Sequence, residues 1–323
     1  MNEELTLERL KELQALPLER KVGFTIARIT EFYDHYNGKC YVSFSGGKDS
    51  TVLLYIARKL FPDIKAVFID TGLEYPEIRD FVRTWDNVDW VKPAKSFLQV
   101  IKEHGFPAIS KEVSEAVYYA KQGSSWALGK MGLGERKNAK QFSYPKYSYL
   151  VDAPFNLSAK CCTIMKKAPT KKYEKETGLH PIMATMTEES VLRRSGWLRT
   201  GCNAFDSKRP HSNPMSFWTE QDVLKYLKLM NIPIAKVYGT IEVESRGGKE
   251  HYFTTGAQRT GCMFCMYGVH LEKEPNRFQN MYYTHPKQWD YCINKLGLKE
   301  VLDYIHVPYE PKIEEKSDLF ENN

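Results

Sequence analysis

The sequence predicts an α/β protein with a doubly wound parallel sheet, preceded by helices and followed by a cysteine-containing helical segment. Three short, mostly apolar runs have the length of buried strands, and they lie at residues 40–44, 66–69 and 88–91. Each run is followed by apolar residues at helical spacing, at residues 51–60, 76–85 and 96–104. Strands that alternate with helices in this way are typical of a parallel sheet with helices on its faces.

The remaining elements lie on both sides of this alternation. They are helices at 5–16, 18–36, 219–230 and beyond 271, a strand at 181–185, and a hairpin or lid at 241–257. Asn37-Gly38 would end the second helix. Thr219 and Asp222 have the spacing of a capping box at the start of the helix that follows them.

Length and composition restrict the class of protein. A chain of 323 residues holds one large α/β domain with an appendage, or two modest domains. Its 42% apolar and 27% charged residues are typical of a globular protein, and no apolar run approaches membrane-spanning length. The acidic N-terminus lacks the layout of a signal peptide, so we expect a cytoplasmic protein without a membrane partner. The net charge of +6 suits anionic ligands such as nucleotides and permits nucleic acid.

A glycine-rich turn joins the first strand to the next helix. It reads Ser45-Gly46-Gly47-Lys48-Asp49-Ser50. Such a turn exposes backbone N–H groups at a helix N-terminus, where the helix dipole adds positive charge, and it therefore predicts a phosphate site. Lys48 would supply a full positive charge, and the two serines would donate hydrogen bonds. The spacing is not that of a Walker loop, and the alternative is an ordinary glycine turn.

A second polar turn follows the second strand. It contains Asp70, Thr71, Gly72 and Glu74. Ligands of doubly wound sheets bind beyond the carboxyl ends of the strands, so this turn and the glycine-rich turn should face one pocket.

Residues 105–160 interrupt the alternation and form a predicted insertion. Gly129, Gly132 and Gly134 favour a mobile loop there. Basic residues alternate with aromatic ones, among them Lys111, Lys121, Lys130, Arg136, Lys137, Lys140, Lys146, Tyr118, Tyr119, Trp126, Phe142, Tyr144, Tyr147 and Tyr149. This mixture is typical of surfaces that bind single-stranded nucleic acid, and the alternative is a solvated insertion whose aromatic residues pack on the sheet.

Four of the seven cysteines form two pairs. Cys161 and Cys162 are adjacent, and Cys262 and Cys265 form a Cys-x-x-Cys motif. Structural zinc ligands are normally two to four residues apart, so adjacent cysteines favour a [4Fe–4S] cluster over zinc or over unligated thiols. The other three are expected to be buried small apolar residues, namely Cys40, Cys202 and Cys292.

With these motifs in place, the chain resembles the phosphoadenylyl-sulfate (PAPS) reductase family over residues 41–268. The glycine-rich turn resembles the loop of the ATP pyrophosphatase, or PP-loop, superfamily, whose fold is adenine nucleotide alpha hydrolase-like. The segment 70–77 resembles the family's Asp-Thr-Gly-x-x-Phe-Pro-Glu motif. Further matches are Cys161-Cys162 with Lys166 and Pro169, Arg259-Thr-Gly-Cys262 with Cys265, and Pro214, Trp218, Asp222, Val223 and Tyr226.

The resemblance implies a [4Fe–4S] cluster beside an adenine-nucleotide pocket. Lys48, Asp49, Arg193 and Arg259 are the expected catalytic residues. Mg²⁺ would assist, held by Asp49 or Asp70. The expected nucleotide-binding residues are Ser45, Gly46, Gly47, Lys48, Asp49, Ser50, Asp70, Thr71, Gly72, Glu74, Glu189 and Ser190, and the expected cluster ligands are Cys161, Cys162, Cys262 and Cys265.

Three departures from the family pattern concern the reaction. Ala184 and Met186 replace a Gly and an Arg that precede Glu189, and Met165 replaces an Arg beside the adjacent cysteines. The sequence ends without the family's nucleophilic Glu-Cys-Gly tail. The loop, in contrast, is intact, and it resembles the loops of related sulfurtransferases that adenylate a substrate before inserting sulfur.

The expected function is therefore the cleavage of ATP to AMP and pyrophosphate, with adenylation of a substrate for sulfur transfer. The alternatives are a sulfite-forming reductase of adenylyl sulfate or phosphoadenylyl sulfate, and a nucleotide-sensing module that binds nucleic acid. Expected partners are an adenine nucleotide, a nucleic-acid acceptor and a sulfur or electron donor protein; the oligomeric state leaves no readable pattern. We expect N-terminal helices at 1–37, a nucleotide-binding domain at 38–239 and a cluster-binding helical segment at 240–323.

Overall fold

The computed structural model describes residues 5–135 and 142–311. The chain forms two compact units. Unit 1 comprises Met1–Ala94 and Lys166–Met263, and unit 2 comprises Lys95–Met165 and Phe264–Asn323. The domain boundaries expected after residues 37 and 239 both fall within unit 1, and they stay a prediction. Arg136, Lys137 and Lys140 of the insertion and the tail from residue 312 lie outside the described residues.

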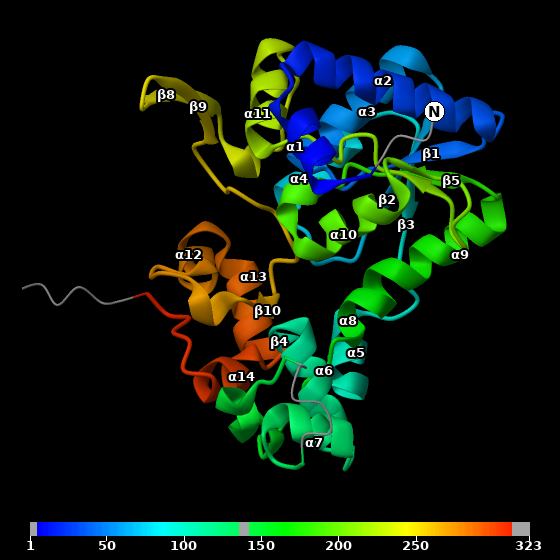
Figure 1. The fold of residues 1–323 in the computed structure, drawn as a ribbon. Helices are drawn as coiled ribbons and strands as arrows, with labels where there is room; N and C mark the ends of the chain where they lie inside the picture. Colours follow the sequence, from blue (N-terminus) through cyan, green and yellow to red (C-terminus); the bar gives the residue numbers. More distant parts are fainter. Residues whose placement is uncertain (1–4, 136–141, 312–323) are drawn as a thin grey trace, which may run out of the picture. The chain divides into compact units, whose positions relative to one another are not determined.

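Unit 1 is built on a six-stranded, mostly parallel sheet, which confirms the predicted fold class. The strand order is β3-β2-β1-β5-β7-β6, and only β6 runs antiparallel to its neighbour. The strands are β1 (Cys40–Ser43), β2 (Lys65–Ile69), β3 (Val88–Val91), β5 (His180–Ile182), β6 (Asn203–Ala204) and β7 (His211–Ser212). The chain moves outward from β1 to β3 and then returns to β5 on the other side of β1, so the order reverses beside β1 (Figure 1). Ligands of open α/β sheets bind at such reversals, beyond the carboxyl ends of the strands.

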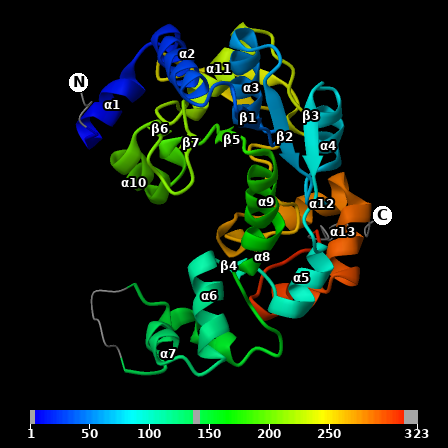
Figure 2. The same ribbon diagram turned by 90° about the vertical axis from the view of Figure 1, so that its right-hand side faces the viewer.

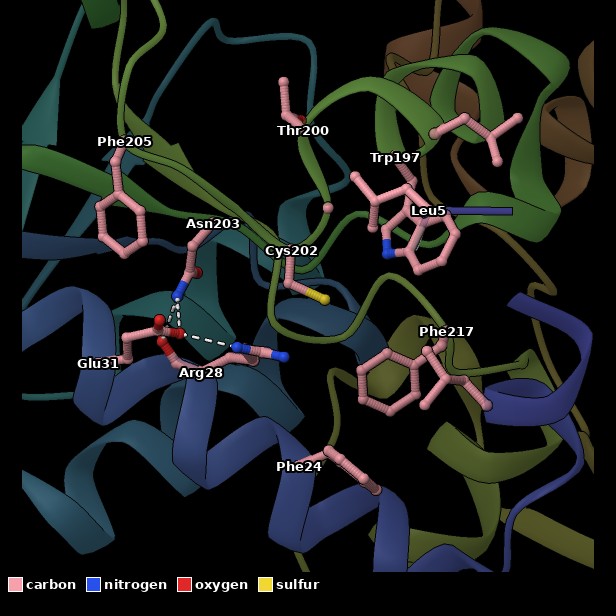
Figure 3. A pocket seen from close by; sticks show the side chains of 13 residues that line it. Leu5, Phe24, Arg28, Glu31, Trp197, Thr200, Cys202, Asn203, Phe205 and Phe217 are labelled. Atoms are coloured by element: carbon pink, nitrogen blue, oxygen red, sulfur yellow. Dashed lines mark hydrogen bonds and ion pairs between the residues drawn. The ribbon is translucent and has the colours of Figure 1, made fainter. Parts of the chain in front are cut away.

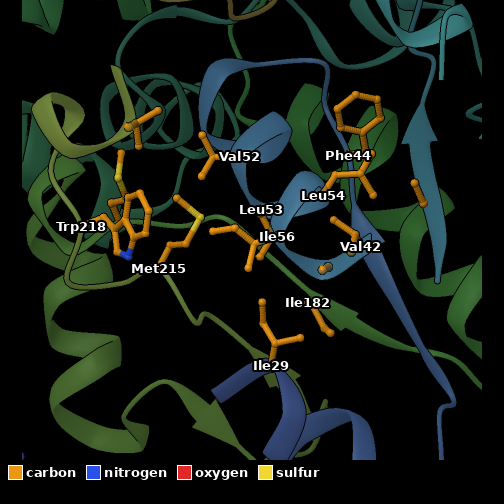
Figure 4. Close-up of a cluster of buried hydrophobic side chains, with 14 of the residues drawn as sticks. Ile29, Val42, Phe44, Val52, Leu53, Leu54, Ile56, Ile182, Met215 and Trp218 are labelled. Atoms are coloured by element: carbon orange, nitrogen blue, oxygen red, sulfur yellow. The ribbon is translucent and has the colours of Figure 1, made fainter. Parts of the chain in front are cut away.

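Alternate residues of a strand point to opposite faces of the sheet, and apolar side chains pack on both faces here. On one face Val42 packs in the main core with Val52 and Ile56 of the helix that follows β1 (Figure 4). On the other face Tyr41 and Val67 pack with a smaller apolar cluster. The helices of unit 1 are α1 (Leu7–Ala15), α2 (Leu18–His35), α3 (Lys48–Leu60), α4 (Pro76–Arg83), α9 (Ala168–Thr177), α10 (Val191–Thr200) and α11 (Glu220–Leu229).

Two local predictions in unit 1 are confirmed. The Thr219 side chain accepts a hydrogen bond from the backbone N–H of Asp222, and the Asp222 carboxylate accepts one from the backbone N–H of Thr219. This capping box begins α11 where the sequence predicts it. The segment expected to form a hairpin contains the antiparallel strands β8 (Ile241–Arg246) and β9 (Lys249–Thr254).

Unit 2 is mainly helical, and its helices correct one prediction. Residues 105–135 form α6 (Lys111–Ala120) and α7 (Ser125–Met131), which pack against each other (Figure 2). Gly129 lies inside α7 and is buried, so the prediction of a mobile loop is wrong at this residue. Gly132 ends α7 in the left-handed conformation, with φ of 77°. The tertiary contact with α6 stabilises a helix that its glycine content disfavours.

The rest of unit 2 consists of short elements. Strand β4 (Ala108–Ile109) pairs in parallel with β10 (Met266–Tyr267). The helices are α5 (Phe97–His104), α8 (Lys160–Cys162), α12 (Arg277–Thr284), α13 (Pro286–Asp290) and α14 (Leu298–Tyr304). Within the described ranges, no helix is both long enough and apolar enough to span a membrane.

Candidate nucleotide site

The glycine-rich turn is held in one shape by its own side chains. The hydroxyl groups of Ser45 and Ser50 lie 3.0 Å apart, and the Ser50 oxygen accepts a hydrogen bond from the backbone N–H of Ser45 at 3.2 Å. Gly46 has φ of 71°, and a Cβ placed there would meet Ile78 and Val82 within 3 Å. Glycine is thus required both by the left-handed backbone and by the close approach of α4. Gly47 caps α3, so the turn ends at a helix N-terminus.

Lys48, the first residue of α3, is buried and its ammonium group has two hydrogen-bond partners. The side chain is only 5% exposed. Its Nζ donates hydrogen bonds to Glu220 Oε1 at 2.8 Å and to the carbonyl oxygen of Gln258 at 2.9 Å. It also lies 5.4 Å from the centre of the Tyr238 ring. A buried ammonium held by a single carboxylate is a cation that an anionic ligand could take over.

Two cavities of unit 1 adjoin this turn. One has a volume of about 240 Å³ and is bordered by Lys48, Asp49, Met186 and Arg259. The other has a volume of about 180 Å³ and is bordered by Phe44, Glu74 and Lys166. Both are bordered by Ser45, Thr260 and Gly261. Together they provide a polar end beside the α3 N-terminus and a narrower end beside the carboxyl ends of β1 and β2.

The charges around the larger cavity alter each other's protonation. Burial raises the pKa of Asp49 to about 6, with Lys48 opposing and Glu220 adding to the shift. Burial also raises the pKa of Glu188 and lowers that of Arg193. Acidic and basic side chains are thus close together and partly shielded from water, which is typical of sites that bind charged ligands.

The residues expected after β2 are only partly directed at these cavities. Glu74 borders the smaller one and accepts hydrogen bonds from the backbone and hydroxyl of Thr71. The buried Asp70 carboxylate pairs with Arg79 at 2.9 Å and accepts from the backbone N–H of Gly72 at 3.3 Å. Ser45 of the first turn and Glu74 of the second therefore border the same smaller cavity. Asp70 is instead paired with Arg79 of α4.

Glu189 and Ser190, which were expected to bind the nucleotide, lie just before α10 and form contacts with its first turn. Ser190 caps α10 by accepting a hydrogen bond from the backbone N–H of Arg193. Glu189 borders the larger cavity, accepts from the backbone N–H of Met186 and forms an ion pair with Arg193. The positive charges of Arg193 and Arg259 both act to lower the pKa of Asp49, against the larger effect of burial.

Sequence reasoning missed several residues of this site. Glu220 binds Lys48, Glu188 accepts a hydrogen bond from the backbone N–H of Glu220 at 2.5 Å, and Tyr238 bonds Thr260 through its hydroxyl. Glu188 stands beside the predicted Glu189, and Glu220 follows the predicted cap Thr219, so adjacency was the one available signal. Thr260 lies within the Arg259-Thr-Gly-Cys262 match, whereas Tyr238 has no motif that marks it.

The four paired cysteines are divided between the two units. Cys161, Cys162 and Cys265 belong to unit 2, and Cys262 lies at the end of unit 1. Burial raises the pKa of Tyr267, and the nearby Cys162, Cys265 and Cys161 raise it further through their charges. Within residues 5–135 and 142–311, no group of three or more His, Cys, Asp or Glu side chains has the geometry to hold a metal ion.

The other three cysteines are buried as predicted. Burial raises the pKa of both the Cys40 and the Cys292 thiol to about 12. Both therefore stay protonated at neutral pH and are poor nucleophiles. The Cys202 sulfur lies 3.3 Å from the Ser216 hydroxyl.

The mostly parallel sheet and the glycine-rich turn at the α3 N-terminus define a doubly wound α/β protein. Residues 39–110 match the family model described as "Phosphoadenosine phosphosulfate reductase domain". This stretch contains both the glycine-rich turn and the Asp70–Glu74 turn. For residues 39–110, the match confirms the resemblance to the PAPS reductase family that the motifs predict.

Curated relatives share the same part of the chain. The uncharacterized protein MJ0973 of Methanocaldococcus jannaschii is 36% identical over 97 residues, which cover 28% of this chain and 23% of the relative. The uncharacterized protein MJ0066 of the same organism is 39% identical over 92 residues, covering 27% and 18%. The chain thus spans less than a quarter of the length of these relatives.

One solved structure that is similar is the phosphoadenylyl-sulfate (PAPS) reductase from Candida auris in a phosphate complex. It has 15% sequence identity and a TM-score of 0.39, over 73% of this chain and 95% of that chain. The fold class follows from the sheet topology of this chain itself.

Proposed function

We propose that this chain is a PP-loop enzyme that cleaves ATP between its α- and β-phosphates and transfers the adenylyl group to an acceptor. The observation that carries this proposal is the buried Lys48, whose ammonium borders the larger cavity at the α3 N-terminus. An intact glycine-rich turn with a buried lysine matches the demand of a pyrophosphate group, which has several charged oxygens to satisfy.

In the proposed reaction, the acceptor nucleophile attacks the α-phosphorus and the bond from that phosphorus to the bridging oxygen breaks. Pyrophosphate leaves with the bonding electrons, and the acceptor carries AMP. Lys48 would exchange Glu220 for a phosphate oxygen and, with the amides of the turn, stabilise the charge that develops on pyrophosphate. Arg193 and Arg259 would neutralise the remaining anionic oxygens.

Mg²⁺ would support this step by binding phosphate oxygens. Carboxylate oxygens are its usual protein ligands, and Asp49 borders the larger cavity. Asp70 is the weaker candidate because its carboxylate already pairs with Arg79. The metal ion would supply further neutralisation of the leaving group.

Two features favour ATP over an adenylyl sulfate as the nucleotide. The glycine-rich turn is complete and preformed by the Ser45–Ser50 contact. Met186, which stands where the PAPS reductase pattern has Arg, is buried and borders the larger cavity. A thioether offers no charge to a sulfate group, so the site lacks one anion-binding group at this position.

The proposal includes a [4Fe–4S] cluster on Cys161, Cys162, Cys262 and Cys265, for use in sulfur transfer. Its support is that Cys161, Cys162 and Cys265 all act on the pKa of Tyr267, and that Cys262 stands three residues before Cys265 in the sequence. The Cys265 carbonyl accepts a hydrogen bond from Arg277 at 3.0 Å, which would orient that ligand's loop. When bound, the cluster would supply an electron-transfer or sulfur-binding centre.

The second candidate function is a sulfite-forming sulfonucleotide reductase, and the description of the matching family model favours it. The acceptor, a nucleic acid among the candidates, and the sulfur or electron donor protein remain part of the proposal. Cytoplasmic localisation likewise stays a prediction.

Nucleotide affinities measured without turnover test the proposal. Calorimetric titration with ATP, AMP and adenylyl sulfate in the presence of Mg²⁺ should rank ATP first, about tenfold or more above AMP, because the pyrophosphate contacts the turn. An enzyme that binds adenylyl sulfate more tightly than ATP would contradict the proposal and favour the reductase.

A further inference from the structure

Unit 1 contains a third, larger cavity that the candidate nucleotide site does not use. It has a volume of about 560 Å³ and is bordered by α1, α2, α10, β6 and the segment before α11. It shares no bordering residue with the two cavities beside the glycine-rich turn. Its volume is within the range of small-molecule pockets, which is about 300–1,000 Å³.

Aromatic side chains border this cavity on several sides, namely Phe24, Trp197, Phe205 and Phe217. Phe24 and Phe217 meet edge to face, with ring centres 6.3 Å apart. Figure 3 shows these two rings below the cavity and the Trp197 ring beside them, with Phe205 on the opposite side. Flat ring surfaces such as these favour a planar aromatic ligand, because rings pack against rings in offset or edge-to-face contacts.

One donor in this wall has no acceptor. Trp197 is 4% exposed, and its Nε1 has no hydrogen-bond partner among the residues that the structure describes. In Figure 3 the nitrogen edge of its ring is turned toward Cys202 and Phe217. A buried N–H without a partner is unfavourable, so an occupant with an acceptor would recover part of that cost.

The charged groups at this cavity are already matched to each other. Arg28 Nη1 lies 3.0 Å from Glu31 Oε2, and the same carboxylate oxygen accepts from the Asn203 amide at 2.9 Å. The Asn203 amide oxygen accepts in turn from the Ser212 hydroxyl. A charged ligand would have to break this pair, whereas an uncharged one would not.

We propose that this cavity binds an uncharged, planar heteroaromatic molecule that accepts a hydrogen bond from Trp197. The ligand stacks among Phe24, Phe217 and Trp197 and leaves the Arg28–Glu31 pair intact. The proposal goes beyond the adenylating activity and does not depend on it, because the two sites share no bordering residue.

Two probes of nearly equal shape test the hydrogen bond. Quinoline has a ring nitrogen that accepts, and naphthalene has none. Ligand-detected NMR titration of the full chain should give quinoline about fivefold tighter binding than naphthalene, which is the worth of one neutral hydrogen bond. Saturating ATP should leave both affinities unchanged.

Matched variants identify the site. In Trp197→Phe, which keeps a ring but removes the donor, the fivefold preference should disappear while naphthalene still binds. Trp126→Phe makes the same change at an exposed residue of unit 2 and should keep the preference. Thr200→Trp, at an exposed residue of the cavity rim, should weaken both probes at least tenfold.

The contradicting results are equally definite. Equal affinities of quinoline and naphthalene for the unchanged chain would overturn the proposed hydrogen bond. Displacement of quinoline by ATP would place the probe in the nucleotide site instead. Unchanged binding to Thr200→Trp, with an unchanged circular dichroism spectrum, would exclude this cavity.

Discussion

The glycine-rich turn of unit 1 and the paired cysteines differ in how the chain brings their parts together. The turn is six consecutive residues, and its shape follows from contacts inside the motif, such as Ser45 with Ser50, and from one neighbouring helix. The cysteines come from two segments about a hundred residues apart, and Cys161, Cys162 and Cys265 come near enough to Tyr267 to raise its pKa only through the fold of unit 2. A contiguous motif predicts its own geometry, whereas a divided motif predicts only which residues belong together.

Replacing one of the four paired cysteines should have the largest effect, because a [4Fe–4S] cluster needs all four thiolate ligands. The substitution tests the divided motif. We expect four iron and four sulfide per chain after anaerobic purification, and loss of both in Cys161→Ser and Cys265→Ser. Cys292→Ser is the matched control, because its thiol is buried and protonated, and it should keep the cluster. Stoichiometric zinc without sulfide would contradict the iron–sulfur assignment.

Gly46→Ala tests the claim that the contiguous motif is fixed by its backbone. The new methyl group would meet Ile78 and Val82 in a residue with φ of 71°. Strain and overlap together should lower the free energy of unfolding by about 2–4 kcal/mol, measured by chemical denaturation.

Gly178→Ala is the matched control for that substitution. Gly178 has a similar φ of 70°, but a Cβ there would meet nothing within 4 Å. The free energy of unfolding should therefore fall only by the cost of the left-handed backbone, about 1–2 kcal/mol. Equal costs at the two positions would show that the contact with α4 does not constrain the turn.

Lys48→Ala tests the turn as a phosphate site. The dissociation constant for ATP should rise about 10- to 100-fold in calorimetric titration, since a charge-assisted hydrogen bond from a buried ammonium is lost. Lys65→Ala is the control, because Lys65 lies in β2, is 39% exposed and pairs with Asp89. If both variants bind ATP as tightly as the unchanged chain, phosphate binds elsewhere.

Asp49→Asn should have the smallest effect, and the effect depends on pH. The pKa of Asp49 in the folded chain, about 6, is above its ordinary value of 3.8, so folding binds a proton between these values. The unchanged chain therefore loses stability as the pH rises from about 4 to about 6, and the loss persists above that range. Asparagine does not titrate.

The free energy of unfolding of Asp49→Asn should accordingly exceed that of the unchanged chain by about 1–2 kcal/mol at pH 8, allowing for the partial exposure of Asp49. The difference should vanish near pH 4. Denaturation curves at several pH values measure it, and a difference that is the same at every pH would refute the raised pKa.

The elements that the sequence predicted are those with a local signal. The strands around β1 have short apolar runs, and α11 has a capping box between Thr219 and Asp222. Helix α7 has no such signal, because Gly129 lies within it and its stability comes from packing on α6. Glu220 and Tyr238 were missed for the same reason, since each reaches Lys48 only after α3, α11 and the segment before β8 are assembled.

The most direct test of the central claim is an anaerobic turnover assay that follows two products in parallel. With ATP as substrate the chain should release pyrophosphate and AMP, stimulated by the acceptor, and Lys48→Ala should abolish that release. With adenylyl sulfate or phosphoadenylyl sulfate, thioredoxin and a reductant, sulfite should stay at the level without protein. Robust thiol-dependent sulfite release, together with no pyrophosphate from ATP, would contradict the adenylation account and establish the reductase.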